Sequence, residues 1–241
     1  AGSINGVITW EFDSGAENFA VLPTDVPYIL TYNVMVTDSA GAVDSKEVTV
    51  EIVGTNDAPV FTGGDRGAVK EDIDVQAGNR LLAADQLEGF DADYGEAEIV
   101  PTASADGLNN VRGSLSILAD GSWNYTVDNA DVQYLSDGQV AIDIFQVVTV
   151  DGATHAIAVR IMGTNDAPVI SVGEADSDSA TLSETDAGLI ASGTLSVKDV
   201  DVRDSVTSSV AGVTVSSGDD GGIDIGVLAD MLIIDDAAII D

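Results

Sequence analysis

One heptapeptide, Gly-Thr-Asn-Asp-Ala-Pro-Val, occurs twice in the chain, at residues 54–60 and 163–169. The two copies are separated by about the length of a small domain, and an identical motif at that distance predicts tandem domains, each with its own core. Each copy follows an alternating apolar run, at 48–53 and at 157–162, which predicts a strand with one buried face. The proline then keeps the chain extended beyond the strand, so the motif marks a boundary between domains.

Each copy also carries two adjacent side chains with oxygen donors, Asn56 with Asp57 and Asn165 with Asp166. An Asx turn that caps the preceding strand would explain one such pair. A domain junction clamped by a cation would explain why the pair recurs at a domain spacing. We favour the junction because there are two copies.

The composition limits the partners that the chain can have. The sequence holds 42 acidic and 8 basic residues, a net charge of −34, which repels nucleic acids and anionic membrane surfaces. We expect neither a nucleic-acid partner nor membrane insertion, since no apolar run is long enough to span a bilayer. The chain is 45% hydrophobic and its apolar runs are rich in Val, Ile and Thr, which favours folded β structure over a disordered acidic tail. Without cysteine, the staple left for small secreted domains is a metal.

Residues 58–166 are expected to form one complete repeat. Its candidate strands A to G are 60–69, 80–90, 98–103, 112–118, 122–127, 141–150 and 155–162. Asp-Gly turns at 120–121 and 151–152 close two hairpins. Short strands separated by such turns predict a Greek-key β-sandwich.

The flanking segments are expected to be parts of further repeats. Residues 1–57 have strand patterns at 7–12, 28–36 and 47–53, too few for a closed sandwich, and so predict the C-terminal part of a repeat. Residues 167–241 predict the N-terminal part of another. Because each part leaves half a core and a strand edge unpaired, we expect chains to associate head to tail. The alternative is that both ends are only partly formed.

Two tryptophans support this alignment of the repeats. Trp10 precedes Asp38 by the same distance along the chain as Trp123 precedes Asp151. Both tryptophans are expected on strand E as core anchors, and sugar binding is the alternative role. The predicted fold class is all-β, with tandem Greek-key sandwiches in a linear array.

Four motifs carry a resemblance to a known family. They are the repeated heptapeptide, Ala-Asp-Gly-Ser-Trp-Asn-Tyr at 119–125, Ser-Gly-Thr-Leu-Ser-Val-Lys-Asp-Val-Asp at 192–201 and Ile-Thr-Trp-Glu-Phe at 8–12. On these motifs the chain resembles the VCBS repeat family, cadherin-like calcium-binding modules of very long secreted adhesins in Gram-negative bacteria. The resemblance implies a cadherin/Ig-like sandwich, calcium as cofactor and a secreted or cell-surface location. The chain departs from the family pattern at 77–87, which lacks Gly-Thr-Leu, and at 90–95, where the approach to Asp-x-Asp is irregular.

The strand directions predict which acids meet at each end of the complete repeat. The first junction, beside the first heptapeptide, would gather Asn56, Asp57, Asp91, Asp93 and Asp151, with Asp120 nearby. The second junction lies one strand length away, roughly 33 Å. It would gather Glu71, Asn165, Asp166, Asp199 and Asp201, with Asp72 and Asp128 as further candidates.

The donors at both junctions are oxygens, which identifies calcium as the best-matched ion. Calcium accepts six to eight oxygen ligands in flexible geometry, whereas magnesium requires a tighter octahedron and zinc or copper prefers nitrogen and sulfur. The competing interpretation is that the Asp-x-Asp pairs at 91–93 and 199–201 are ordinary solvated loop acids. Their recurrence at nearly the spacing of the heptapeptide favours the metal site. No EF-hand loop follows either pair.

The sequence favours a structural module over an enzyme. The single histidine, His155, stands apart from any patterned nucleophile, so we expect no catalytic activity. We predict calcium-stiffened extender repeats of a large secreted or cell-surface bacterial adhesin, in contact with neighbouring repeats of the same parent chain and supporting cell adhesion or biofilm formation. The alternative is a sandwich that binds a glycan or a partner protein, although aromatic residues make up only 5% of the chain.

Overall fold

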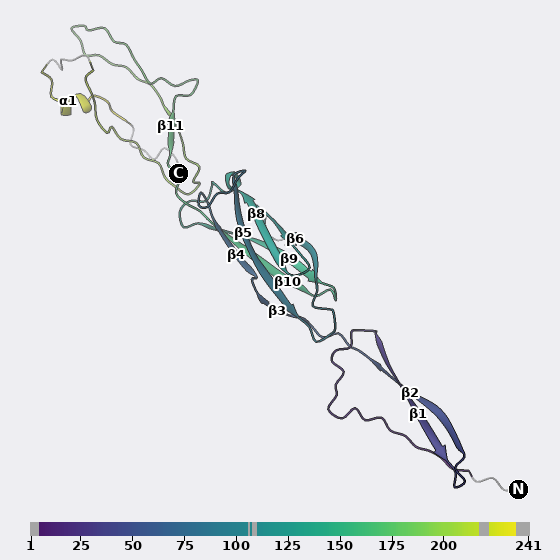
Figure 1. Cartoon of the computed structure of the whole chain (residues 1–241). Helices are drawn as coiled ribbons and strands as arrows, with labels where there is room; N and C mark the ends of the chain where they lie inside the picture. Colours follow the sequence, from purple (N-terminus) through teal and green to yellow (C-terminus); the bar gives the residue numbers. More distant parts are fainter. Residues whose placement is uncertain (1–4, 106, 108–109, 217–221, 235–241) are drawn as a thin grey trace.

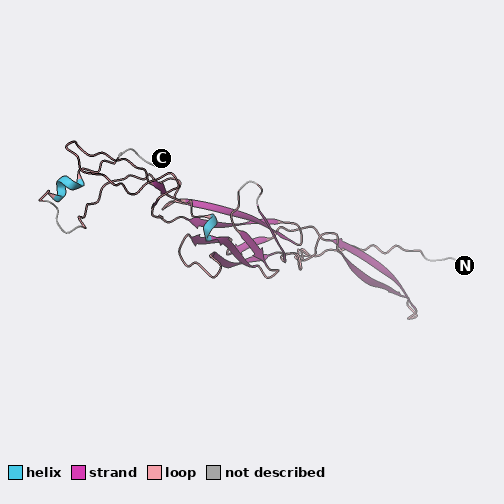
Figure 2. Ribbon diagram, turned by 90° about the horizontal axis from the view of Figure 1, so that it is seen from above, coloured by secondary structure: helices cyan, strands magenta, loops and turns pink. Residues whose placement is uncertain are grey.

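The computed structural model describes residues 5–105, 107, 110–216 and 222–234. Within these ranges the chain is almost entirely strand and connecting segment, apart from a single-turn 3-10 helix, η1 (Asn129–Asp131), and a short helix, α1 (Ile225–Ala229). The molecule is elongated: a central sandwich lies between an N-terminal hairpin and a C-terminal segment (Figures 1 and 2). The predicted all-β class is confirmed.

Two four-stranded sheets form the central sandwich. The first has the order β3 (Val60–Gly63), β5 (Arg80–Phe90), β8 (Ser122–Asp128) and β7 (Ser114–Ile117). The second has the order β4 (Arg66–Lys70), β10 (Thr154–Met162), β9 (Val140–Thr149) and β6 (Ile99–Ala105). Neighbouring strands are antiparallel, except that β4 runs parallel to β10. This order is the Greek-key arrangement expected from the turn spacing.

Of the strands predicted for the central sandwich, strand A is the one whose arrangement the structure contradicts. The range expected as one strand, 60–69, is two strands in different sheets, β3 and β4. The chain changes sheets at Gly63, whose φ of 86° lies in the region that favours glycine. The carbonyl of Gly64 then accepts a hydrogen bond from Trp123 Nε1 at 2.6 Å, which ties the crossover to the core. Strand B is correct at both ends, since β5 spans 80–90.

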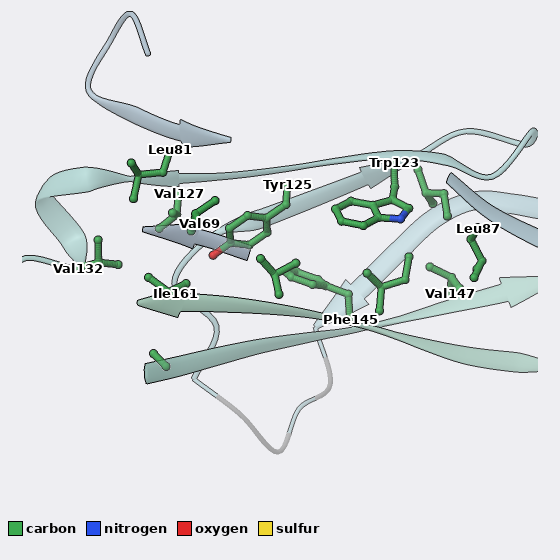
Figure 3. Packing of buried hydrophobic residues seen from close by; sticks show 14 of the residues in the cluster. Val69, Leu81, Leu87, Trp123, Tyr125, Val127, Val132, Phe145, Val147 and Ile161 are labelled. Carbon is green, nitrogen blue, oxygen red and sulfur yellow. The ribbon is translucent and has the colours of Figure 1, made fainter. Parts of the chain in front are cut away.

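The core lies between the two sheets and is built around the aromatic residues of β8 and β9 (Figure 3). Trp123 is 1% exposed and Tyr125 is 0% exposed. The Tyr125 and Phe145 rings meet edge to face at 6.0 Å, a favoured aromatic geometry. Leu81 and Leu87 from β5 complete the packing, so the sandwich closes only when strands of both sheets are present.

The N-terminal segment forms a hairpin of β1 (Pro27–Thr37) and β2 (Val43–Val53). The strand expected at 7–12 is absent, and residues 5–14 have no regular secondary structure. Its counterpart in the centre, β8, is held between β5 and β7, and the described residues before the hairpin hold no such strands. Trp10 is accordingly 60% exposed and does not act as the core anchor that we expected.

The C-terminal segment begins with a short antiparallel pair, β11 (Val169–Ser171) and β12 (Ser196–Lys198). Its register repeats that of the central sandwich: Val169 faces Lys198 as Val60 faces Phe90. The described helices are all too short or too polar to cross a membrane.

Candidate metal sites at the two junctions

The first junction joins the linker to the loop after β5 through main-chain donors. The Asp57 N–H donates to Asp93 Oδ2 at 2.7 Å, and the Asp93 N–H donates to Asp91 Oδ1 at 2.9 Å. Asn56 Nδ2 donates to the Asp57 carbonyl at 3.0 Å. The heptapeptide and the Asp-x-Asp motif are therefore brought together, as the strand directions predicted.

The second junction repeats these contacts. The Asp166 N–H donates to Asp201 Oδ2 at 2.7 Å, the Asp201 N–H donates to Asp199 Oδ1 at 3.0 Å, and Asn165 Nδ2 donates to the Asp166 carbonyl at 2.9 Å. Asp201 is 2% exposed, as is Asp93 in the first junction. These two acids are therefore buried within the junctions and are not ordinary solvated loop residues.

Asp151 belongs to the first junction, as predicted, and its carboxylate is already hydrogen-bonded. It accepts from the Thr149 hydroxyl and from the Ala153 N–H at 3.2 Å. Loss of hydration raises its pKa, but the hydrogen bonds from Thr149, Ala153 and Asn56 outweigh this and hold the pKa of Asp151 below its usual value. Asp151 therefore stays ionised beside the other acids.

Glu71 is the buried acid of the second junction. Glu71 is 0% exposed, and its Oε2 accepts a hydrogen bond from the Thr164 N–H at 3.1 Å. Burial, together with the negative charges of Asp166, Asp72 and Asp201, raises the pKa of Glu71 to about 7. Burial and the nearby carboxylates also raise the pKa of Asp166. These shifts show that negative charge is crowded at this junction.

Both junctions contain buried carboxylate oxygens without a hydrogen-bond donor. They are Asp91 Oδ2, Asp93 Oδ1 and Glu96 Oε2 at the first junction, and Glu71 Oε1, Asp166 Oδ2 and Asp201 Oδ1 at the second. A buried charged oxygen without a partner is destabilising. A hard cation would satisfy such oxygens, so the donor chemistry fits calcium.

The side chains are not yet grouped as tightly as ligands around an ion. Across the described ranges, no three His, Asp or Glu side chains are close enough together to hold a metal. Calcium tolerates irregular shells completed by carbonyls and water. The residues thus match the ion in chemistry and burial, while binding would require the carboxylates to move closer.

Glu96 is a first-junction residue that the sequence predictions missed. Loss of hydration and the charges of Asp93, Asp151 and Asp91 raise its pKa. A usable signal was present, since an acid follows the Asp-x-Asp motif at the same offset in both repeats, Glu96 after Asp93 and Asp204 after Asp201.

Two further candidates serve as local caps. Asp120 Oδ1 accepts from the Ser122 N–H at 2.9 Å and stabilises the turn before β8. Asp128 Oδ1 accepts from the Ala130 N–H and from Asn79 Nδ2, both at 3.0 Å, at the start of η1. Asp72, by contrast, contributes to the charge around Glu71 while its carboxylate accepts from Asn129 Nδ2 at 2.7 Å.

A fully buried acid outside the junctions, Asp143, was also missed. Its carboxylate accepts from the N–H groups of Arg112 and Gly113, each at 2.8 Å, and from the Tyr125 hydroxyl at 2.7 Å. The Arg112 guanidinium forms an ion pair with it at 3.2 Å. Asp143 occupies an inward-facing position of the β9 alternation, and a charged residue at a core position is a signal that could have identified it.

The fold and the junctions together define a central β-sandwich joined through acidic clusters to a β segment on either side. A family profile described as a bacterial cadherin-like domain matches residues 56–163. This segment, which contains the whole central sandwich, is therefore similar to bacterial cadherin-like domains.

Two solved structures resemble longer parts of the chain at low similarity. One is PcdhgB3 EC1–4, at 16% identity, 73% coverage of this chain, 50% of that chain and a TM-score of 0.35. The other is the sialic acid binding region of a Streptococcus sanguinis SK1 adhesin, at 13% identity, 59% coverage of this chain, 38% of that chain and a TM-score of 0.29. This chain thus spans half or less of each of these structures, and the scores are too low to support an argument about function. No curated protein matches the sequence.

Proposed function

We propose that the chain consists of extender repeats stiffened by calcium at their junctions, in a large secreted or cell-surface bacterial adhesin that supports adhesion or biofilm formation and needs no catalysis. In this proposal one whole repeat, 58–166, lies between parts of two others, 1–57 and 167–241. The observation that carries it is the set of unpaired, buried carboxylate oxygens found at both junctions. The similarity of residues 56–163 to bacterial cadherin-like domains supports the extracellular setting.

The stiffening would arise from electrostatics across the second junction. Glu71 comes from the central sandwich, Asp166 from the linker, and Asp199 and Asp201 from the segment that follows. Like charges gathered in a partly dehydrated site repel one another, which favours a bent or open junction. Bound calcium supplies the positive charge and oxygen coordination that would draw these carboxylates together. Extracellular modules of this kind bind calcium with Kd values of about 10⁻⁴–10⁻³ M.

Small-angle scattering with and without calcium tests this function. Calcium should extend and narrow the distribution of interatomic distances, and at 100 times Kd it should stabilise a folded site by about 2.7 kcal/mol. Magnesium at the same concentration is the matched control and should do much less, because it needs a more regular shell. Unchanged scattering and unchanged melting after addition of EDTA would reject the proposal.

We further propose that the incomplete ends associate head to tail between copies of this chain. Trp10 is 60% exposed, whereas its counterpart Trp123 is 1% exposed. Leu195 is 51% exposed, whereas its counterpart Leu87, on the strand β5 that pairs with β8, is 1% exposed. The two ends thus expose the two complementary halves of the core that the central sandwich packs together.

Sedimentation velocity at increasing concentration tests this association. Trp10→Ser and Leu195→Ser should each shift the chain toward monomer, because each removes an apolar contact from the complementary faces. Ile190→Ser is the matched control, since Ile190 is 89% exposed and its counterpart Leu82 stays 52% exposed in the complete sandwich. A monomer at high concentration in saturating calcium would contradict the association.

A further inference from the structure

The second junction contains a direct contact between neighbouring units in addition to its acidic cluster. The Val202 N–H donates to the Tyr134 carbonyl at 3.4 Å, and the Arg203 N–H donates to Ser136 Oγ at 3.2 Å. The acceptors belong to the segment between η1 and β9 of the central sandwich. The donors directly follow the Asp-x-Asp motif of the next unit. These contacts involve no carboxylate and therefore need no cation.

The first junction has the same contact at the corresponding positions. The Tyr94 N–H donates to the Val21 carbonyl at 3.3 Å. Val21 follows Trp10 at the same distance along the chain as Tyr134 follows Trp123. The side chains differ at both positions while the main-chain contact is retained. The contact therefore depends on the course of the backbone and not on the side chains. We call residues 21–23 and 134–136 the docking loops.

The glycine of the heptapeptide allows each docking loop to reach this position. A Cβ atom built on Gly163 would lie 2.0 Å from the Leu135 carbonyl oxygen and 2.5 Å from that of Ser136. A Cβ atom on Gly54 would lie 2.0 Å from the Leu22 carbonyl oxygen. No real side chain tolerates such distances, so both docking loops require glycine at the end of the adjoining strand.

We propose that the docking loop and the heptapeptide glycine form a metal-independent latch that restricts the orientation of each unit relative to the next. The loop packs on the glycine within one unit and presents its carbonyl to the residue after Asp-x-Asp in the following unit. The hydrogen bonds are long for N–H to oxygen, so the latch influences the relative orientation of the units more than it adds to the binding energy between them. The latch does not depend on the proposed calcium sites, and the heptapeptide linker is consequently not a free hinge when calcium is absent.

Spin-label distances in the full chain test the latch at each junction separately. The chain has no cysteine, so paired labels are introduced as Arg66→Cys with Ser192→Cys across the second junction, and Thr31→Cys with Arg66→Cys across the first. With Gly163→Ala, the distance distribution across the second junction should become at least twofold broader, both in EDTA and in saturating calcium. The distribution across the first junction should not change. Gly212→Ala is the control, because a Cβ atom there has nothing within 4 Å.

Two results would overturn the latch. One is a Gly163→Ala distribution as narrow as that of the parent, and the other is broadening in EDTA alone, which would assign the orientation to the cation. Tryptophan fluorescence in a Trp10→Phe background, where Trp123 is the remaining tryptophan, checks that the central sandwich of the variant is folded. If it is not, Ser136→Ala removes only the acceptor of the Arg203 N–H and should broaden the same distribution to a smaller extent, and no broadening would again reject the latch. Failure of the calcium proposal is distinct, since calcium would then leave both distributions of the parent chain unchanged.

Discussion

The central sandwich and the N-terminal hairpin use closely related strands but bury them to different extents. Trp123 and Phe145 are 1% and 4% exposed, whereas their counterparts Trp10 and Tyr32 are 60% and 45% exposed. The hairpin pairs β1 with β2 just as the centre pairs β9 with β10, so local strand pairing does not account for the difference. The centre has a second sheet opposite its aromatic residues, and in the part of the chain that the structure describes no second sheet covers the hairpin. Burial in this fold is therefore a property of the pair of sheets.

The largest difference in stability is expected when the equivalent tryptophans of the central sandwich and the N-terminal segment are each replaced. Trp123→Ala should destabilise the central sandwich by about 3–5 kcal/mol, because it empties a large core site and removes the hydrogen bond to Gly64. At protein concentrations low enough for the chain to be monomeric, Trp10→Ala should change stability by no more than about 0.5 kcal/mol, as for other exposed sites. Urea denaturation followed by circular dichroism measures both. Similar losses for the two variants would show that the hairpin is covered in solution.

A second prediction uses a core position where the two regions differ chemically. Asp143 of β9 corresponds to the half-buried Leu30 of β1, because each follows its tryptophan, Trp123 or Trp10, at the same distance along the chain. Asp143→Ala should cost about 3 kcal/mol, because it leaves Arg112 and two main-chain N–H groups without their acceptor. Leu30→Ala should cost less, since one side of its site is already open. Chemical denaturation that shows equal costs would contradict a special role for the buried carboxylate.

The third prediction concerns pH and distinguishes the buried junction acid from the exposed acids of the hairpin. The folded-state pKa of Glu71 is raised from 4.5 to about 7, so the folded state favours the protonated form. Its contribution to stability is present below pH 4.5 and is lost as the pH rises through 7. In EDTA, Glu71→Gln should thus stabilise the chain at pH 8 by at most about 3 kcal/mol and have little effect at pH 4.

Thermal melting of both proteins across this pH range measures the effect of Glu71→Gln. Glu47→Gln, on an exposed position of β2, is the control and should show no such dependence. Equal pH profiles for the parent and Glu71→Gln would mean that Glu71 is hydrated in solution.

The smallest effect on stability is expected for substitutions in the linkers, and each should affect one junction alone. Asp57→Ala should weaken calcium binding at the first junction and Asp166→Ala at the second, because the two sites share no residues. Each variant should lose one class of site in calorimetric titration, with a change in calcium-free stability of about 1 kcal/mol or less. Loss of both classes from one substitution would show that the junctions are coupled.

The features that depend on neighbours along the chain can be predicted from the amino-acid sequence. Alternation of apolar residues located the strands of the central sandwich other than strand A, including both ends of β5, and the repeated heptapeptide located the junctions. The Asp-x-Asp motifs were correctly placed beside the linkers, because strand direction alone carries them to that end of a sandwich.

The features that depend on which segment packs against a given residue are visible only in the folded molecule. The same Trp-containing pattern is a buried strand at 122–128 and an irregular segment near Trp10, because strand pairing and burial require partners that no local pattern encodes. The change of sheet at Gly63, the recruitment of Glu96 and the docking of residues 134–136 on the next unit are decided in the same way. Each depends on the close approach of segments far apart in the chain, where sterics and loss of hydration select the outcome.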